Sequence, residues 1–232
     1  MNYRSIILTV LLIIWLVAAT TVYFTFYPRK DKGSVKTIAQ IAIFGALAAI
    51  LYTVPIFNIK LPFFPSFLSL HFDEIPSFIA GFAYGPWAAI GTILVKTIIK
   101  LPMTSTMAVG EIGDFLFSTA FVLPAVLIYQ KKRNLKGVGL GFLVSTSIHV
   151  VVAMAGNVYL LMPFYMQFMA GLSYDVLLKL CQMAMPGITD LGWSYATIAV
   201  LPFNILKDAL VIIATFLVYR SIHTLIKPSK RA

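Results

Sequence analysis

The chain alternates long apolar stretches with short polar connections, and this pattern predicts membrane-crossing helices. A transmembrane helix needs about 20 consecutive apolar residues. The apolar stretches are Ile6–Tyr27, Ile38–Val54, Ile75–Tyr84, Trp87–Ile99, Ile112–Tyr129, Val138–Leu161 and Trp193–Tyr219. The third and fourth are short, and Gly85-Pro86 between them is typical of a turn. The apolar pattern alone leaves open whether these two form one helix or two.

Basic residues decide between these alternatives. They gather in three clusters, at residues 29–36, 131–136 and 220–231, which hold 12 of the 18 Lys and Arg. Cytoplasmic loops of membrane proteins are enriched in Lys and Arg, so we expect all three clusters on the cytoplasmic side. An even number of crossings then separates them, which requires two short helices around the turn. The N-terminus is predicted outside the cell and the C-terminus in the cytoplasm.

We therefore predict an all-α integral membrane protein, with a six-helix core at residues 35–232 and one extra helix within residues 1–34. The extra segment, Ile6–Tyr27, has 22 uncharged residues and no small-residue cleavage motif after it. We interpret it as a retained transmembrane helix, followed by a cytoplasmic basic loop. The long connections Pro55–Glu74 and Met162–Leu191 are rich in aromatic residues, Met and Pro. We expect them to fold over the external mouth of the core.

Composition excludes several classes of protein. The chain is 60% hydrophobic and 11% charged, with a mean hydropathy of +0.92, whereas soluble domains carry about 25% charged residues. No soluble ATPase or kinase domain fits in the remainder. The net charge of +10 is explained by basic loops beside the spans, so we expect no nucleic acid partner. The single cysteine, Cys181, excludes an internal disulfide and a multi-cysteine metal site.

Three polar residues interrupt the last apolar span, in the stretch PFNILKDAL: Asn204, Lys207 and Asp208. A charge at membrane depth costs about 2.5–3.5 kcal/mol on insertion scales, so something must compensate for it. Spacings of three and four residues place all three on one helix face, which we expect to look into a cavity. Lys207 could also simply pair with Asp208 or with an acidic residue elsewhere.

A second polar position is Asn157, which we expect to end the fifth core helix, in AGNVYLLMPFY. It could cap this helix end, or it could offer an amide to the cavity together with Asn204 and Lys207. Amides and an ammonium group among apolar and aromatic residues suit a flat, largely apolar ligand with a polar edge. Further candidates for the cavity or its mouth are Asp73, Lys96, Glu111 and Tyr159.

Acidic residues gather at the starts of two predicted core helices: Asp73, Glu74, Glu111 and Asp114. Acids at a helix N-terminus complement the helix dipole, and this is our leading interpretation. Glu111 and Asp114 could also face the cavity mouth and neutralise Lys207 or Lys96. Lys96 lies near a helix end, so it could extend to the membrane surface or pair with an acid.

Small residues recur at a spacing of four in the first core helix, IAQIAIFGALAAIL. Ala42 and Ala46 form one such pair, and Gly45 and Ala49 form another. Small residues at this spacing let helices approach closely in lipid. The pairs could serve packing within the bundle, or Ala42 and Ala46 could dock another membrane subunit.

Catalytic and metal-binding motifs are not found in the sequence. His71, His149 and His223 are scattered, without an HExxH pair, and no GxxxxGK[ST] loop or plausible Ser/His/Asp set occurs. The dense array of intramembrane acids expected of a proton-driven pump is missing as well. We therefore expect neither an enzyme nor a resident metal or cofactor.

Several stretches together resemble a known family, in order and at compatible spacing from Lys36 to the C-terminus. They are LHFDEIPSFIAGFAYGPWAAI, TILVKTIIKL, VGEIGDFLFSTAFVLPAVLIY, AGNVYLLMPFY and PFNILKDALV. The chain resembles the riboflavin-specific substrate-binding (S) components of energy-coupling factor (ECF) vitamin transporters of prokaryotes. The resemblance implies a non-enzymatic subunit of the cell membrane, surrounded by lipid, that captures riboflavin from outside. It would act with a transmembrane coupling subunit and two cytoplasmic ATPases, and topple in the membrane to release its ligand.

The resemblance also implies roles for single residues. Asn157, Asn204 and Lys207 match residues that contact the flavin in the family, while Ala42 and Ala46 match a motif that faces the coupling subunit. Three features depart from the family's pattern. Ile6–Tyr27 is an additional helix, the connection Met162–Leu191 is long, and Asp114 stands where many relatives have an amide, so no role is transferred to it.

Other functions remain open from the sequence. The S component could serve another flat vitamin or a flavin analogue. The chain could be a membrane-embedded enzyme with Lys207, Asp208 and Glu111 as acid and base groups, and would then turn over a substrate alone. A carrier or channel independent of partners would transport without ATPases.

Overall fold

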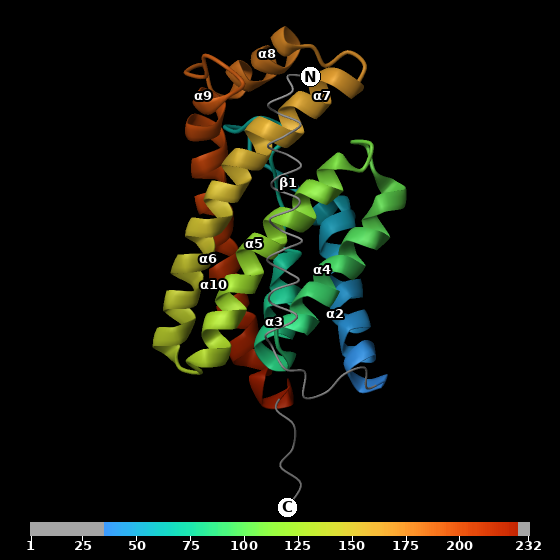
Figure 1. The fold of residues 1–232 in the computed structure, drawn as a ribbon, viewed down its shortest axis with the longest axis vertical. Coiled ribbons are helices and arrows are strands. Elements are labelled where there is room, and N and C mark those ends of the chain that lie inside the picture. Colours follow the sequence, from blue (N-terminus) through green and yellow to red (C-terminus); the bar gives the residue numbers. More distant parts are fainter. Residues whose placement is uncertain (1–34, 227–232) are drawn as a thin grey trace, which may run out of the picture.

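The computed structural model describes residues 35–226 of the 232. The predicted helix Ile6–Tyr27, most of the basic loop after it and residues 227–232 of the basic tail lie outside this range. Figure 1 shows long helices running side by side. The principal ones are α2 (Val35–Thr53), α3 (Glu74–Tyr84), α4 (Pro86–Lys100), α5 (Val109–Lys131), α6 (Leu135–Gly156) and α10 (Leu201–Ile226).

Helices α3 and α4 are separate, as the sequence predicts. Gly85 joins them with φ = 98°, a left-handed conformation that glycine adopts without steric cost, and Pro86 begins α4 with a φ suited to a first helical residue. Five segments within residues 35–226 are long and apolar enough to cross a membrane, and α3, with 11 residues, is not among them. Two crossings in this region therefore stay a prediction.

Two of the long helices contain a π-helical turn. Helix α6 continues through η3 (Asn157–Leu161) into α7 (Met162–Phe168), and α9 (Trp193–Tyr195) continues through η4 (Ala196–Val200) into α10. Such turns are rare and often occur at functional sites. The expectation that Asn157 ends or caps a helix is therefore wrong, since the helical path runs on to Phe168.

The two long connections pack together over one end of the bundle. The first contains η1 (Pro55–Phe57) and the antiparallel strands β1 (Ile59–Lys60) and β2 (Ser69–Leu70); the second contains α8 (Tyr174–Ala184), and η2 (Leu101–Met103) follows α4. Phe64 packs edge-on against Phe203 of α10, with ring centroids 5.3 Å apart. Leu177 and Cys181 of α8 are buried in the same apolar cluster. The predicted folding of these connections over the core is confirmed, while the side of the membrane on which they lie stays a prediction.

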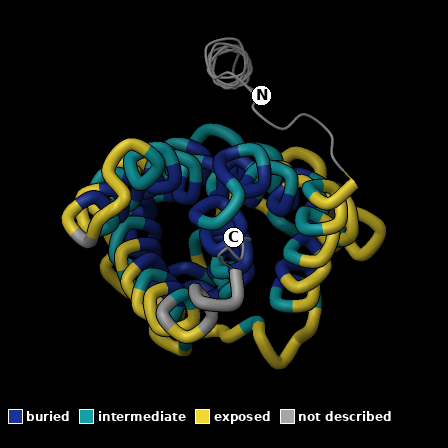
Figure 2. The backbone as a smooth tube through the Cα atoms, turned by 90° about the horizontal axis from the view of Figure 1, so that it is seen from below, coloured by how far each residue is buried: buried dark blue, intermediate teal, exposed yellow. Residues whose placement is uncertain are grey.

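The distribution of exposed residues suits a lipid environment. Figure 2, viewed along the helices, shows buried positions facing inward and exposed ones around the outside. Phe78, Phe121 and Phe142 meet in the interior at centroid distances of 5.0–5.3 Å. Large apolar side chains such as Leu143 and Val151 are instead about two-thirds exposed. In water such a surface would be costly, whereas in a bilayer it contacts acyl chains.

Candidate functional site

The three residues predicted to bind a ligand line one cavity of about 250 Å³ beneath the packed connections. Asn157, Asn204 and Lys207 are each at least 93% buried. Aromatic and charged side chains from α2, α5 and α6 complete the walls, among them Tyr52, Glu111, Asp114, Phe117 and His149. We call this space the amide cavity. Asn157 lies in the π-helical turn η3, and Asn204 lies four residues after η4.

Lys207 forms its ion pair with an acid from another helix. Its Nζ donates to Glu74 Oε1 at 2.6 Å and lies 3.5 Å from His71 Nδ1. The predicted alternative that Lys207 pairs with Asp208 is therefore wrong, and the alternative that it pairs with an acidic residue elsewhere in the chain is confirmed. Because the carboxylate of Glu74 compensates for the charge, the lysine can remain an ammonium ion at membrane depth, with part of its hydrogen-bonding capacity available to the cavity.

Asp208 has a different partner. Its two carboxylate oxygens lie 2.9 and 3.0 Å from His149 Nδ1, and Asp208 is fully buried. The ring of His149 stacks on Phe121 with centroids 5.0 Å apart. Asp208 thus holds a cavity-lining histidine in place and does not itself line the cavity.

The amides of Asn157 and Asn204 are oriented by hydrogen bonds to backbone carbonyls four residues earlier. Asn157 Nδ2 donates to the Ala153 carbonyl at 2.9 Å, and Asn204 Nδ2 donates to that of Val200 at 2.8 Å. The oxygen of Asn157 also accepts a hydrogen bond from the Tyr195 hydroxyl at 3.1 Å. The oxygen of Asn204 has no hydrogen-bond donor among the described residues. Each amide keeps one N–H, and Asn204 keeps its acceptor.

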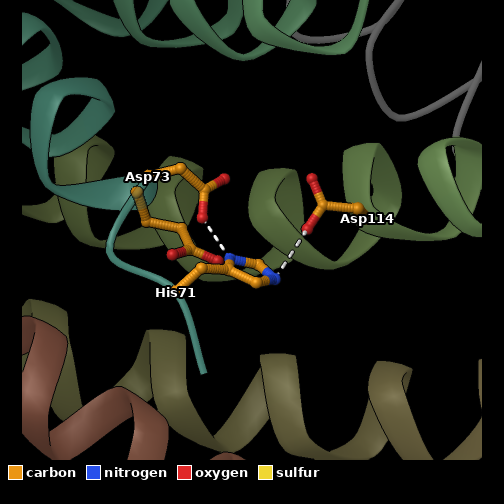
Figure 3. Close-up of side chains that lie close together, drawn as sticks. His71, Asp73 and Asp114 are labelled. Atoms are coloured by element: carbon orange, nitrogen blue, oxygen red, sulfur yellow. Dashed lines mark hydrogen bonds and ion pairs between the residues drawn. The ribbon is translucent and has the colours of Figure 1, made fainter. Parts of the chain in front are cut away.

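A buried charge network adjoins the cavity, and two of its members, His71 and Asp114, are part of the cavity wall. Lys96 is fully buried and contacts Asp73, Asp114 at 2.9 Å and the Ser118 hydroxyl at 2.8 Å. His71 lies between the two aspartates, hydrogen-bonded to Asp73 and 3.9 Å from Asp114 (Figure 3). Lys96 therefore pairs with acids and does not extend to the membrane surface, and pairing with Asp114 is one of the predicted alternatives.

The helix-dipole interpretation fits the positions of three of the four acids, since Asp73 is the N-cap of α3 and Glu74 and Glu111 lie in the first turns of α3 and α5. Asp73 stands at the N-cap of α3 but makes no side-chain cap hydrogen bond, because its carboxylate is engaged by Lys96 and His71. Glu111 does lie in the first turn of α5, where the hydroxyls of Thr104 and Thr106 donate to it at 2.7 and 3.0 Å. Glu111 lines the amide cavity as well.

Four side chains of this region offer metal-ligand atoms within 4.8 Å of one another: His71, Asp73, Glu74 and Asp114. Two ammonium groups already lie against these carboxylates, Lys96 at Asp73 and Asp114 and Lys207 at Glu74. A cation placed among them would be repelled by both lysines. The arrangement is better explained as an internal ion-pair network than as a metal centre.

The remaining predicted residues lie elsewhere. Asp73 and Lys96 stand behind the cavity, and Tyr159 is not among the residues that line it; its ring packs edge-on against Trp193 at 6.2 Å. Ala42 and Ala46 are exposed on the outer face of α2. The second pair points inward, since a Cβ on Gly45 would lie 2.5 Å from Val95 of α4. The two small-residue pairs are thus separated, one packing the bundle and one open to a partner.

Sequence reasoning missed three contributors to the site. His71 and His149 were treated as scattered residues, although His149 lies inside the apolar span Val138–Leu161 and is a functional candidate by the rule applied to Lys207. His71 lies in the connection before α3, where that rule does not apply. Tyr195 contacts Asn157 across 38 positions of sequence, and no local pattern indicates such a contact. Only the fold brings the end of α9 and the start of η3 together.

Comparison with known proteins identifies the family. Residues 36–219 match the family described as the substrate-specific component of ECF transporters. The chain belongs to this family. As an S component it is a membrane-embedded transport subunit and not an enzyme, which agrees with the resemblance drawn from its motifs.

Individual relatives of this S component span nearly the same length. It is 30% identical to the riboflavin transporter RibU of Staphylococcus aureus, over 85% of this chain and 97% of the relative. It is 24% identical to the riboflavin transporter FmnP of Bacillus subtilis, over 84% and 97%. A solved S component of a bacterial ECF transporter superposes with a TM-score of 0.60 at 28% identity, covering 83% of this chain and 98% of that one.

Proposed function

We propose that this S component binds riboflavin in the amide cavity and delivers it to an ATP-hydrolysing ECF module for import. The observation that carries the proposal is the hydrogen-bonding polarity of the cavity. Asn157 and Lys207 present donors, and Asn204 presents an acceptor beside a donor. Two curated relatives named as riboflavin transporters support the choice of ligand.

The chemistry of the flavin fits this polarity. The uracil-like edge of its isoalloxazine ring presents two carbonyl acceptors on either side of one N–H donor. Asn204 Oδ1 suits that N–H, while Lys207 and the remaining N–H of Asn157 suit the carbonyls. Phe117, Phe203 and Leu161 give the cavity apolar surface for the dimethylbenzene edge. Riboflavin enters this scheme as the transported ligand and not as a cofactor.

Flavin absorbance tests the proposal directly. The purified full-length protein should carry flavin and appear yellow, and after removal of the ligand it should quench the fluorescence of added riboflavin with a stoichiometry of one. Thiamine and biotin, which lack the fused flavin ring, serve as competitors that should not displace it. A colourless protein that fails to quench riboflavin fluorescence would contradict the ligand assignment while leaving family membership intact.

The direction of transport follows from the same proposal. The amide cavity lies beneath the connections predicted to be external, and the basic turn between α5 and α6 lies at the other end of the bundle (Figure 1). Positive residues favour the cytoplasmic side, which gives a cytoplasmic C-terminus and capture from outside. A stand-alone carrier would instead move riboflavin into liposomes without a coupling subunit and ATPases, whereas the S component alone should bind but not transport.

The exposed alanines of α2 are the proposed contact with the coupling subunit. Replacing both Ala42 and Ala46 by tryptophan should abolish ATP-dependent uptake by the complete transporter, because the indole rings would prevent close helix approach. Riboflavin binding should be unchanged, since neither residue lines the amide cavity. Ile43→Trp is the matched control, because Ile43 is exposed on the same helix. Normal uptake by the double variant would refute this docking role.

Tyr195 should affect ligand binding only through Asn157. Removing its hydroxyl in Tyr195→Phe frees the Asn157 amide to rotate, and we expect riboflavin affinity to fall about 2- to 10-fold, as for the loss of roughly 0.5–1.4 kcal/mol of hydrogen bonding. In the background of Asn157→Ala the same substitution should have no further effect on affinity. Additive losses in this double-mutant cycle would show that Tyr195 acts on the fold in general.

A further inference from the structure

A second cavity lies at the opposite end of the bundle from the amide cavity. It measures about 250 Å³ and is formed by α3, α5, α6 and α10, close to the connection between α5 and α6. Figure 1 shows this connection and the end of α10 at the bottom of the molecule, away from α7 and α8. None of the residues assigned to flavin binding lines it. Transport of riboflavin therefore leaves it without a role.

The walls of this space are mainly aromatic, and we call it the aromatic cavity. Its rings come from Phe82, Tyr129, Phe142, Phe216 and Tyr219. Phe82 packs edge-on against Tyr129 and Tyr219 at centroid distances of 4.9 and 5.8 Å. These contacts arrange three of the rings side by side around the space. A flexible apolar chain would fill it and gain dispersion contacts with the rings.

Two polar groups of the aromatic cavity point to what accompanies that chain. Thr215 lines the cavity and is 99% buried, yet its hydroxyl has no hydrogen-bond partner among the described residues. An unpaired buried donor is unfavourable, so an acceptor on a bound molecule would satisfy it. Arg133 lines the exposed rim; its guanidinium donates to Gln130 at 2.6 Å and keeps further donors for an anion.

We propose that the aromatic cavity binds an acyl chain of an anionic phospholipid. The chain lies among the aromatic rings, an ester carbonyl accepts from the Thr215 hydroxyl, and the phosphate contacts Arg133. The basic rim, the unpaired hydroxyl of Thr215 and the aromatic rings offer partners for the phosphate, an ester and the hydrocarbon of one phospholipid. The exposed Lys131, Lys132 and Lys136 beside the rim add attraction for an anionic headgroup.

A polar planar ligand is a poorer match to the same cavity. Apart from Asn134 the lining offers no amide, and the Asn134 Oδ1 already accepts from the Gly137 N–H at 2.8 Å to cap α6, which leaves this amide only its N–H donors. The lining holds no carboxylate either. The walls are mainly apolar and aromatic, and they carry the Thr215 hydroxyl, two tyrosine hydroxyls that lie 3.5 Å from each other, and one basic rim residue. Such walls suit a lipid better than a vitamin or a nucleotide.

Native mass spectrometry of the delipidated full-length protein tests the proposal. Phosphatidylglycerol should be retained as one molecule, with an affinity at least about fivefold above that of phosphatidylcholine with the same chains. Arg133→Gln should remove this preference, and Thr215→Val should lower the affinity for both lipids. Lys132→Gln is the matched control for net charge: it removes one charge from the same turn without lining the cavity, so it should reduce the preference much less than Arg133→Gln does. Equal effects of the two charge substitutions, or no preference in the wild type, would overturn the proposal.

Photolabelling locates the lipid independently of affinity. Phosphatidylglycerol carrying a diazirine in its acyl chain should label peptides of α5, α6 and α10 around Tyr129, Phe142 and Phe216, and Val138→Trp, which fills the cavity, should reduce this labelling severalfold. Riboflavin binding at the far end reports whether the variant is folded. Labelling confined to the exposed face of α2, or labelling unaffected by Val138→Trp in a folded protein, would contradict a site in the aromatic cavity.

Discussion

Replacing Lys96 by methionine is expected to lower the free energy of unfolding by about 3–5 kcal/mol, the usual cost of removing one partner from a buried ion pair. Methionine retains most of the side-chain volume, so the loss reports charge and not packing. The substitution leaves the buried Asp73 and Asp114 without their ammonium partner. Thermal unfolding in detergent should shift down by more than about 6 °C, since a chain of this size loses roughly 2–4 °C per kcal/mol.

Two further variants separate charge from other causes. Lys100→Met lies one helical turn away on α4 and is only half-buried, so it should shift the unfolding temperature little. Adding Asp73→Asn to Lys96→Met removes one of the stranded negative charges and should restore part of the stability. If Lys96→Met and Lys100→Met lowered the unfolding temperature by equally small amounts, the charge network beside the amide cavity would not contribute substantially to the stability of the fold.

Much of the fold could be predicted because lipid imposes a simple rule on sequence. Apolar stretches had to become helices, since no other open structure satisfies the backbone in a bilayer, and the start of α4 at Pro86 and the end of α3 at Tyr84 agree with prediction within one residue. The π-helical turn at Asn157 was not predictable. A single extra residue in a helical turn leaves no mark on the apolar pattern, and the helix was therefore expected to end there.

The sequence predicted which residues form the site better than it predicted the contacts that these residues make. Asn157, Asn204 and Lys207 meet around one cavity, as expected from their positions on two spans. Their partners come from distant segments, with Glu74 lying 133 positions from Lys207 and Tyr195 lying 38 from Asn157. An acid at a helix start, such as Glu74, is already explained locally by the helix dipole. Because of that explanation, its tertiary ion pair with Lys207 was not predicted. For each charged residue in an apolar span, the prediction should therefore name the residue of opposite charge that pairs with it.

The proposed role of Lys207 as a charged donor to the ligand gives the largest expected effect on riboflavin binding. Lys207→Met should weaken riboflavin binding by about 1–3 kcal/mol, or roughly 5- to 150-fold in Kd, because a buried carbonyl of the ligand loses its charged donor. The loss of affinity in Asn204→Ala should lie in the same range, since this substitution removes the acceptor for the flavin N–H. Titration of flavin fluorescence with the purified variants measures both losses.

Loss of Lys207 also strands Glu74, so binding and stability must be separated. The double variant Lys207→Met with Glu74→Gln removes both charges of the 2.6 Å pair and should regain much of the lost thermal stability, because no uncompensated buried charge remains. Its riboflavin affinity should stay as low as that of Lys207→Met alone. Recovery of affinity together with stability would mean that Lys207 only balances Glu74, whereas recovery of stability alone identifies the ammonium group as a donor to the ligand.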